Sequence, residues 1–197
     1  MTRRTQTLPD AYFVGIYADN PDPWSFTSSS YERDKYGATL ASLPRARYRS
    51  AFEPACSIGV FTRALSERCD RLLATDLVPA AVEAARARCA DRPQVEVRVG
   101  AMPNDWPEER FDLIVLSEFL YFLAPADFAD LVRRAGEAIE PGGDLVLVHW
   151  LGVTDYPLSG DAAAEGFIRL AAPFAQVLHH SRAADYRIDV LRAGGDA

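Results

Sequence analysis

The feature that most constrains this chain is the alternation of short apolar segments with segments of helical periodicity, which continues from residue 31 almost to the end. The pattern predicts strands over 51–53, 72–76, 95–99, 111–116 and 145–148, and helices over 31–43, 60–68, 79–89, 128–139 and 161–170. Residues 175–179 and 186–192 are predicted to pair as an antiparallel hairpin. Strands that alternate with helices form a mostly parallel sheet with right-handed crossovers. We therefore expect an α/β fold with helices on both faces of one sheet, a three-layer sandwich.

Local sequence refines this expectation. Residues 95–99 alternate valine with charged side chains, which is typical of an edge strand, whereas 111–116 are nearly all apolar, as in a central parallel strand. The Pro141-Gly142-Gly143 run is predicted to end the preceding helix. Residues 1–30 are expected to be irregular, yet they are rich in aromatic side chains, so we expect them to pack against a site or a neighbouring subunit.

Length and composition limit the functional classes. A chain of 197 residues fits one domain, and we divide it into an N-terminal lid and helix (1–43), a cofactor-binding core (44–150) and the C-terminal part of the sheet (151–197). The formal charge of −7 argues against nucleic acid as a partner. The cysteines at positions 56, 69 and 89 form no disulfide or zinc pattern, and no signal peptide or membrane span is recognised. We expect a cytoplasmic protein that binds no metal.

Three segments that follow the first three predicted strands would meet at the carboxyl edge of the sheet, where ligands bind in such folds. The loop Glu53–Gly59 is built from small residues but holds a single glycine, so it suits a nucleoside with an amino-acid tail better than a pyrophosphate. Asp76 is placed to bind both ribose hydroxyls, or alternatively to cap the next helix. Met102 is placed to flank an adenine ring, or alternatively to fill the core. The series predicts a class I methyltransferase (Rossmann-like) fold that binds S-adenosylmethionine.

Longer runs then resemble a known family, the nodulation protein S-like S-adenosylmethionine-dependent methyltransferases. The runs that carry the resemblance are Tyr17–Trp24, Tyr31-Glu32, Lys35-Tyr36, Phe52–Pro54, Cys56–Gly59, Ala74–Asp76, Phe111–Glu118, Tyr121, Pro141–Gly143 and His149-Trp150. The resemblance implies a seven-stranded sheet whose last pair is antiparallel. It also implies S-adenosylmethionine as methyl donor and an amino sugar or similar amine as acceptor.

The chain departs from the family pattern at two positions. Ala55 replaces a glycine that is usual in the cofactor loop, which is expected to shift the loop slightly without abolishing binding. After Asp161, three alanines stand where the family often has a histidine, so any role of that histidine must fall to another group here.

These arguments assign roles to individual residues. Glu118 and His149 follow or end the fourth and fifth predicted strands, and each is a candidate to bind or deprotonate an amine; the alternatives are a helix-start carboxylate and a packed histidine. The residues expected to bind the cofactor are Glu53, Ala55, Cys56, Ser57, Gly59, Asp76, Leu77, Gly100, Ala101, Met102 and Ser117. The aromatic residues expected to form the lid and the substrate walls are Tyr17, Trp24, Tyr31 and Tyr121.

The sequence therefore predicts N-methylation of a small polar acceptor by a monomer or homodimer that contacts neither membrane nor nucleic acid. The alternatives are an O-methyltransferase acting on a sugar or polyol and a non-catalytic cofactor-binding subunit. A nicotinamide-dependent oxidoreductase is disfavoured by the glycine-poor loop.

Overall fold

Within residues 2–195, which the computed structural model describes, seven strands form one sheet in the order β3-β2-β1-β4-β5-β7-β6. The strands are β1 (Ala51–Pro54), β2 (Leu72–Asp76), β3 (Val95–Val99), β4 (Phe111–Ser117), β5 (Ile139–Trp150), β6 (Ala175–Arg182) and β7 (Tyr186–Ala193). Neighbouring strands from β3 to β5 are parallel, while β7 is antiparallel to both β5 and β6. The predicted α/β class, the seven strands and the final antiparallel hairpin are confirmed.

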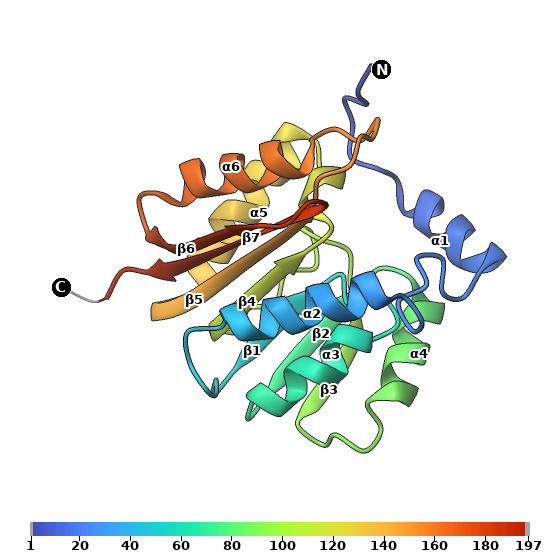
Figure 1. Cartoon of the computed structure of the whole chain (residues 1–197), viewed down its shortest axis with the longest axis horizontal. Coiled ribbons are helices and arrows are strands. Elements are labelled where there is room, and N and C mark those ends of the chain that lie inside the picture. The colour runs from blue at the N-terminus through green and yellow to red at the C-terminus, as the bar shows by residue number, and fades with distance from the viewer. Residues whose placement is uncertain (1, 196–197) are drawn as a thin grey trace.

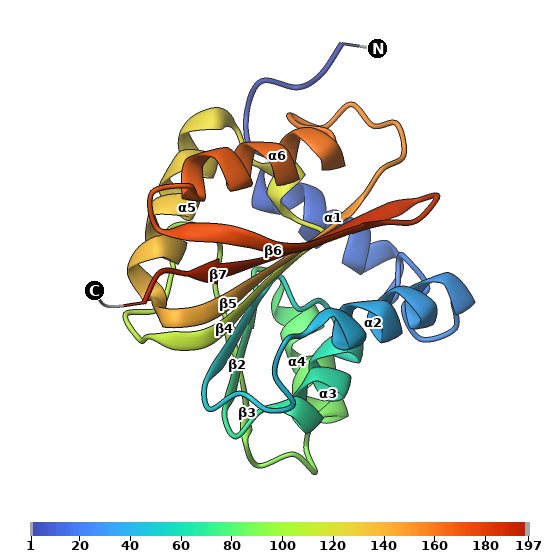
Figure 2. The ribbon, with the colours of Figure 1, turned by 60° about the vertical axis from the view of Figure 1, so that its left-hand side comes forward.

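Helices cover both faces of the sheet, as Figures 1 and 2 show. The helices are α1 (Asp10–Asp19), α2 (Ser30–Ser42), α3 (Val60–Leu65), α4 (Pro79–Arg88), α5 (Pro125–Ala138) and α6 (Gly160–Ala171), with short 3₁₀ turns η1 (Ser66–Arg68) and η2 (Leu120–Phe122). One face carries α2, α3 and α4, and the other carries α5 and α6. Each face buries its own apolar cluster, so the sheet is the middle layer of three.

The local sequence explains the main elements. In α5, the side chains of Phe128, Leu131, Val132 and Ala135 recur on one face and are buried, while Pro125 occupies a first-turn position that needs no backbone donor. The strands β2 and β4 are buried almost throughout, and β3 lies at the sheet edge as its alternating pattern predicts. None of the helices within residues 2–195 combines the length and apolar character that crossing a bilayer requires.

The strand order places a ligand site at one end of the sheet. β1 pairs with β2 on one side and with β4 on the other. The strand order therefore reverses at β1, and in such sheets a crevice opens outside the carboxyl ends of the strands at this point. In Figure 1, α1 lies beyond this end of the sheet.

Two local predictions were wrong. Residues 10–19 were expected to be irregular but form α1, because this helix is held by tertiary contacts of side chains such as Tyr17 rather than by a one-sided apolar stripe. The Pro141-Gly142-Gly143 run does not separate a helix from a strand: α5 ends at Ala138, and β5 already begins at Ile139. The register on β4 jumps from Ile139 to Asp144, so the intervening residues form a bulge inside a longer strand.

The predicted division of the chain into parts stays a prediction. Its outermost residues, 1 and 196–197, lie outside the described residues.

Candidate active site

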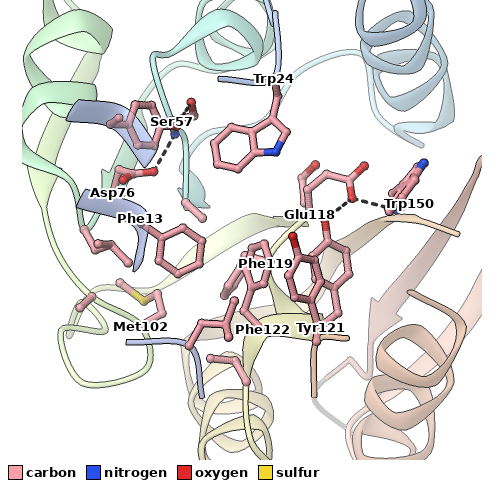
Figure 3. A pocket seen from close by; sticks show the side chains of 18 of the residues that line it. Phe13, Trp24, Ser57, Asp76, Met102, Glu118, Phe119, Tyr121, Phe122 and Trp150 are labelled. Atoms are coloured by element: carbon pink, nitrogen blue, oxygen red, sulfur yellow. Dashed lines mark hydrogen bonds between the residues drawn. The ribbon is translucent and has the colours of Figure 1, made fainter. Parts of the chain in front are cut away.

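A cavity of about 470 Å³ lies beyond the carboxyl ends of β1, β2 and β4, under the N-terminal segment (Figure 3). Most of the side chains predicted for the site line it. These are Tyr17, Trp24, Tyr31, Ala55, Ser57, Asp76, Leu77, Gly100, Ala101, Met102, Ser117, Glu118 and Tyr121. Segments that are far apart in the sequence are therefore brought to one concave surface, as expected for a ligand site in this class of fold.

The loop after β1 turns through left-handed backbone conformations. The φ angles are +58° at Ala55, +53° at Ser57 and +76° at Gly59. Such angles favour glycine, which explains why a glycine at position 55 suits the loop and why Ala55 is accommodated only with local strain. The conformation at Ser57 lets its backbone N–H donate a 2.8 Å hydrogen bond to Asp76.

Asp76 caps the start of α4, one of the two roles that its position suggested, and it also lines the cavity. Its Oδ1 accepts the backbone N–H of Val78 at 2.9 Å, at the start of α4, and its Oδ2 accepts that of Ser57. Burial raises the pKa of this carboxyl, and the backbone hydrogen bonds oppose that effect. A carboxylate has about four acceptor positions, so Asp76 keeps acceptor capacity for a ligand hydroxyl beside its backbone hydrogen bonds.

Three residues predicted to bind the cofactor lie behind the cavity wall instead of lining it. Glu53 is buried in β1, and burial raises the pKa of its carboxyl to about 8. The buried thiol of Cys56 packs in a small apolar cluster. A Cβ atom on Gly59 would lie 2.8 Å from both Cα and Cβ of Ala85, so this glycine is needed for close packing against α4.

Glu118 follows β4 and also has a left-handed backbone, with φ of +61°. Its Oε2 accepts hydrogen bonds from the hydroxyl of Tyr121 and the backbone N–H of Trp150, both at 2.8 Å (Figure 3). Its Oε1 lies 2.5 Å from Nζ of Lys35. The carboxylate is thus held by donors from three different elements.

Lys35 is the main site residue that the sequence interpretation missed. It lies on α2, its side chain is only 3% exposed, and its ammonium also contacts Glu32 Oε1 at 3.0 Å. The ammonium lies 4.9 Å from the ring centroid of Tyr31. Tyr31, Glu32 and Lys35 share one face of the helix by their i, i+3/i+4 spacing, and this pattern was the available signal.

His149 does not line the cavity. It lies near the end of β5, fully buried, with its ring 5.8 Å from that of Tyr121, and the cavity wall here is Tyr121. Neither ring nitrogen has a hydrogen-bond partner among the described residues, and burial lowers the pKa of the imidazole to about 4. This geometry favours Glu118 over His149 as the group that meets an acceptor.

The N-terminal segment supplies one wall of the cavity. The hydroxyl of Tyr17 on α1 hydrogen-bonds to Oγ of Ser57, which links this helix directly to the cofactor loop. The Trp24 ring packs against Tyr17 at 5.7 Å and remains 39% exposed. The wall also contains aromatic residues that were not assigned from the sequence, namely Phe13, Phe26, Phe119, Phe122, Trp150 and Tyr156.

Comparisons with known proteins identify the family and the fold. The model of the family described as nodulation protein S (NodS) matches residues 16–139. Nodulation protein S of Rhizobium tropici is 34% identical over 129 residues, which are 64% of this chain and 53% of that protein. This chain spans about half the length of the curated relatives it matches.

Solved structures show the same fold. N-methyltransferase NodS from Bradyrhizobium japonicum WM9, in complex with S-adenosyl-L-homocysteine, has a TM-score of 0.79 at 22% identity, over 93% of this chain and 98% of its own. A protein from Pseudomonas syringae has a TM-score of 0.73 at 38% identity, over 83% of this chain and 99% of its own.

Proposed function

The chain belongs to the nodulation protein S family, and from this premise we propose that it is an S-adenosylmethionine-dependent methyltransferase that methylates an amine of a small polar acceptor, such as an amino sugar. The observation that carries the proposal is the cavity between Asp76 and Glu118, two carboxylates that both retain capacity to accept hydrogen bonds. We assign the first to the cofactor ribose and the second to the acceptor.

The residues present suit this cofactor. The remaining acceptor capacity of Asp76 suits a ribose hydroxyl, and Met102 and Leu77 offer apolar surface for an adenine ring. The loop Glu53–Gly59 lacks the glycines with which a pyrophosphate cradle is built, which argues against a dinucleotide. When bound, S-adenosylmethionine supplies a methyl group on a positively charged sulfur.

The acceptor side suits an amine. Glu118 can accept a hydrogen bond from an N–H group, and the buried hydroxyl of Tyr31 has no partner among the described residues, so a bound acceptor can satisfy it. The exposed ring faces of Trp24 and Trp150 suit both a sugar ring and a positive charge. The relative from Bradyrhizobium japonicum is described as an N-methyltransferase, which supports the same class of acceptor.

The task of the protein residues is mainly to align the reactants. Displacement at a sulfonium methyl needs the acceptor nitrogen in line with the carbon–sulfur bond, and such positioning is worth about 7–11 kcal/mol. Asp76 fixes the nucleoside, Glu118 fixes the nitrogen, and the aromatic wall of the N-terminal segment keeps water from the reacting atoms.

The test is a methyl-transfer assay on the full chain, with mass spectrometry of the product. Glucosamine and de-N-acetylated chitotetraose are the amine acceptors, and fully N-acetylated chitotetraose is the matched acceptor without a free amine. We expect methylation of the first two only. Equal methylation of the acetylated oligomer would instead indicate O-methylation, and cofactor binding without turnover on any acceptor would contradict an enzymatic role.

A further inference from the structure

The site also contains a cluster of three charges, formed by the buried Glu32 and Lys35 and the half-buried Glu118. A buried ammonium is costly unless carboxylates and hydrogen bonds compensate its lost hydration. Here Lys35 meets one oxygen of Glu32 at 3.0 Å and one oxygen of Glu118 at 2.5 Å. The cation is therefore committed to these two carboxylates, which come from α2 and from the end of β4.

The hydrogen bonds of Glu118 leave one direction open. A carboxylate has about four acceptor positions, two on each oxygen. On Oε2 both are filled, by Tyr121 and by the Trp150 backbone. On Oε1 one is filled by Lys35, and the side chain remains 19% exposed where it lines the cavity. One acceptor position on Oε1 is left for a ligand.

Lys35 determines where that open position points. Tyr121 and Trp150 both bind Oε2, so alone they fix one oxygen and leave the carboxylate free to pivot about it. The contact of Oε1 with Lys35 removes this rotation. Because Lys35 is itself held by Glu32 and by burial against Tyr31, the constraint is rigid.

We propose that Lys35 is a positioning residue: it orients the Glu118 carboxylate so that Oε1 accepts an N–H hydrogen bond from the acceptor and thereby directs the nitrogen lone pair at the methyl group. This inference rests on the proposed function. It assigns Glu118 to orientation of the amine, and it assigns Lys35 to the methyl acceptor side of the cavity and not to binding of the cofactor carboxylate.

The test uses the double variant Lys35→Met with Glu32→Gln, which removes the ion pair while keeping the net charge of the cluster. The matched control is Arg86→Met with Glu83→Gln, another i, i+3 pair of a carboxylate and a cation, which lies on α4 away from the cavity. For each protein we measure the thermal midpoint, the Kd of S-adenosylhomocysteine, and kcat and KM for de-N-acetylated chitotetraose. The crystal structure of the Lys35 double variant is also determined.

We expect the Lys35 double variant to fold and to bind S-adenosylhomocysteine within about twofold of wild type, because the cofactor contacts are untouched. Its kcat should fall by about 10- to 100-fold, the cost of misaligning a reacting group. The control variant should match wild type in every measurement. In the variant structure, the Glu118 carboxylate should be rotated about its Oε2 contacts.

An unchanged kcat would overturn the proposal, and so would a loss of cofactor affinity that equals the loss of turnover, since that would place Lys35 in the cofactor site. If wild type itself transfers no methyl group, the proposed function fails. The crystal structure of the double variant then still tests the positioning role of Lys35, because an unmoved Glu118 carboxylate contradicts it. Should the double variant not fold, Lys35→Arg decides, because the larger, planar guanidinium presents its donors in a different geometry from an ammonium and so displaces the Glu118 carboxylate. That variant should lose turnover at least several-fold while it keeps cofactor affinity, and wild-type turnover would overturn the proposal.

Discussion

At the scale of single residues, three of the four non-glycine residues with positive φ angles in residues 2–195 follow the neighbouring strands β1 and β4, whose ends border the cavity. Ala55 and Ser57 after β1, and Glu118 after β4, all have positive φ angles although none is glycine. Left-handed conformations cost such residues about 1 kcal/mol or more, and they persist where the surrounding structure imposes them. Here the conformations aim the Ser57 N–H at Asp76 and the Glu118 side chain at Lys35.

Gly59 should tolerate no side chain. Its φ of +76° and the 2.8 Å approach to Ala85 mean that Gly59→Ala adds both backbone strain and overpacking, with an expected loss of about 2–4 kcal/mol in the free energy of unfolding. Gly37→Ala is the matched control, because this exposed helical glycine has nothing within 4 Å of the added Cβ. It should gain about 0.5–1 kcal/mol by helix propensity. Urea denaturation measures both, and equal effects of the two variants would contradict the packing argument.

His149 should make the protein sensitive to acid. Its imidazole pKa is about 4 in the folded protein and near 6.5 when unfolded, so the unfolded chain binds more protons between these values. Stability from this residue is complete above pH 6.5 and is lost as the pH falls toward 4, by up to about 3 kcal/mol.

The substitution His149→Leu should therefore flatten the dependence of unfolding free energy on pH over this range. His179→Leu, on the exposed strand β6, leaves His149 in place and should retain the wild-type slope. Identical slopes for the two variants in denaturation series would show that His149 is not the cause.

At the scale of secondary-structure elements, α1 and the loop Glu53–Gly59 form one unit around the cavity. Tyr17 is buried against Ile58, Val78 and Ala81, and its hydroxyl contacts Ser57. A ligand in the cavity would add contacts to α1, in which Tyr17 is the buried residue. The helix should thus be among the elements whose stability depends most on the cofactor.

Hydrogen–deuterium exchange should reveal this dependence. Saturating S-adenosylhomocysteine should slow amide exchange in α1 and in residues 53–59. Exchange in the hairpin β6–β7 should slow less, because Ala175–Ala193 contribute nothing to the described cavity wall and gain only the overall stabilisation that ligand binding gives the fold. Protection confined to the hairpin, or spread evenly over the chain, would argue against α1 as a cofactor-dependent cover.

At the scale of the whole molecule, charge favours a cationic ligand. The chain has a net charge of −7, and the described wall of the cavity carries four carboxylates, Asp10, Glu32, Asp76 and Glu118, against the single ammonium of Lys35. Because Lys35 is already paired with two of these carboxylates, the potential in the cavity remains negative. A sulfonium or an ammonium is attracted to such a site, whereas a bound pyrophosphate would be repelled.

Cofactor binding should accordingly stabilise the entire fold. S-adenosylhomocysteine at about 100 times its Kd should add about 2.7 kcal/mol, which corresponds to an increase in Tm of roughly 5–10 °C for a chain of this size. NAD at the same concentration should leave Tm unchanged. A thermal-shift series checks both, and a larger shift with NAD would overturn the choice of cofactor.

The sequence alone predicted the sheet, most of its elements and much of the cavity wall. These features depend on local signals: apolar periodicity separates strands from helices, and the residues after strands β1, β2 and β4 must meet because parallel strands share a carboxyl edge. Asp76 and Glu118 were found in this way, and both line the cavity.

Only the tertiary structure decided which side chains face the ligand and which support them. Lys35 and Glu118 are 83 positions apart, so no periodicity relates them, and their contact exists because α2 packs beside the end of β4. Burial is likewise set by distant segments: His149 and Gly59 follow the expected strand ends, yet Tyr121 and α4 pack over them and exclude them from the cavity. Helix α1 belongs to the same group, because it is held by contacts with residues that are distant in the sequence, such as Ile58 and Val78.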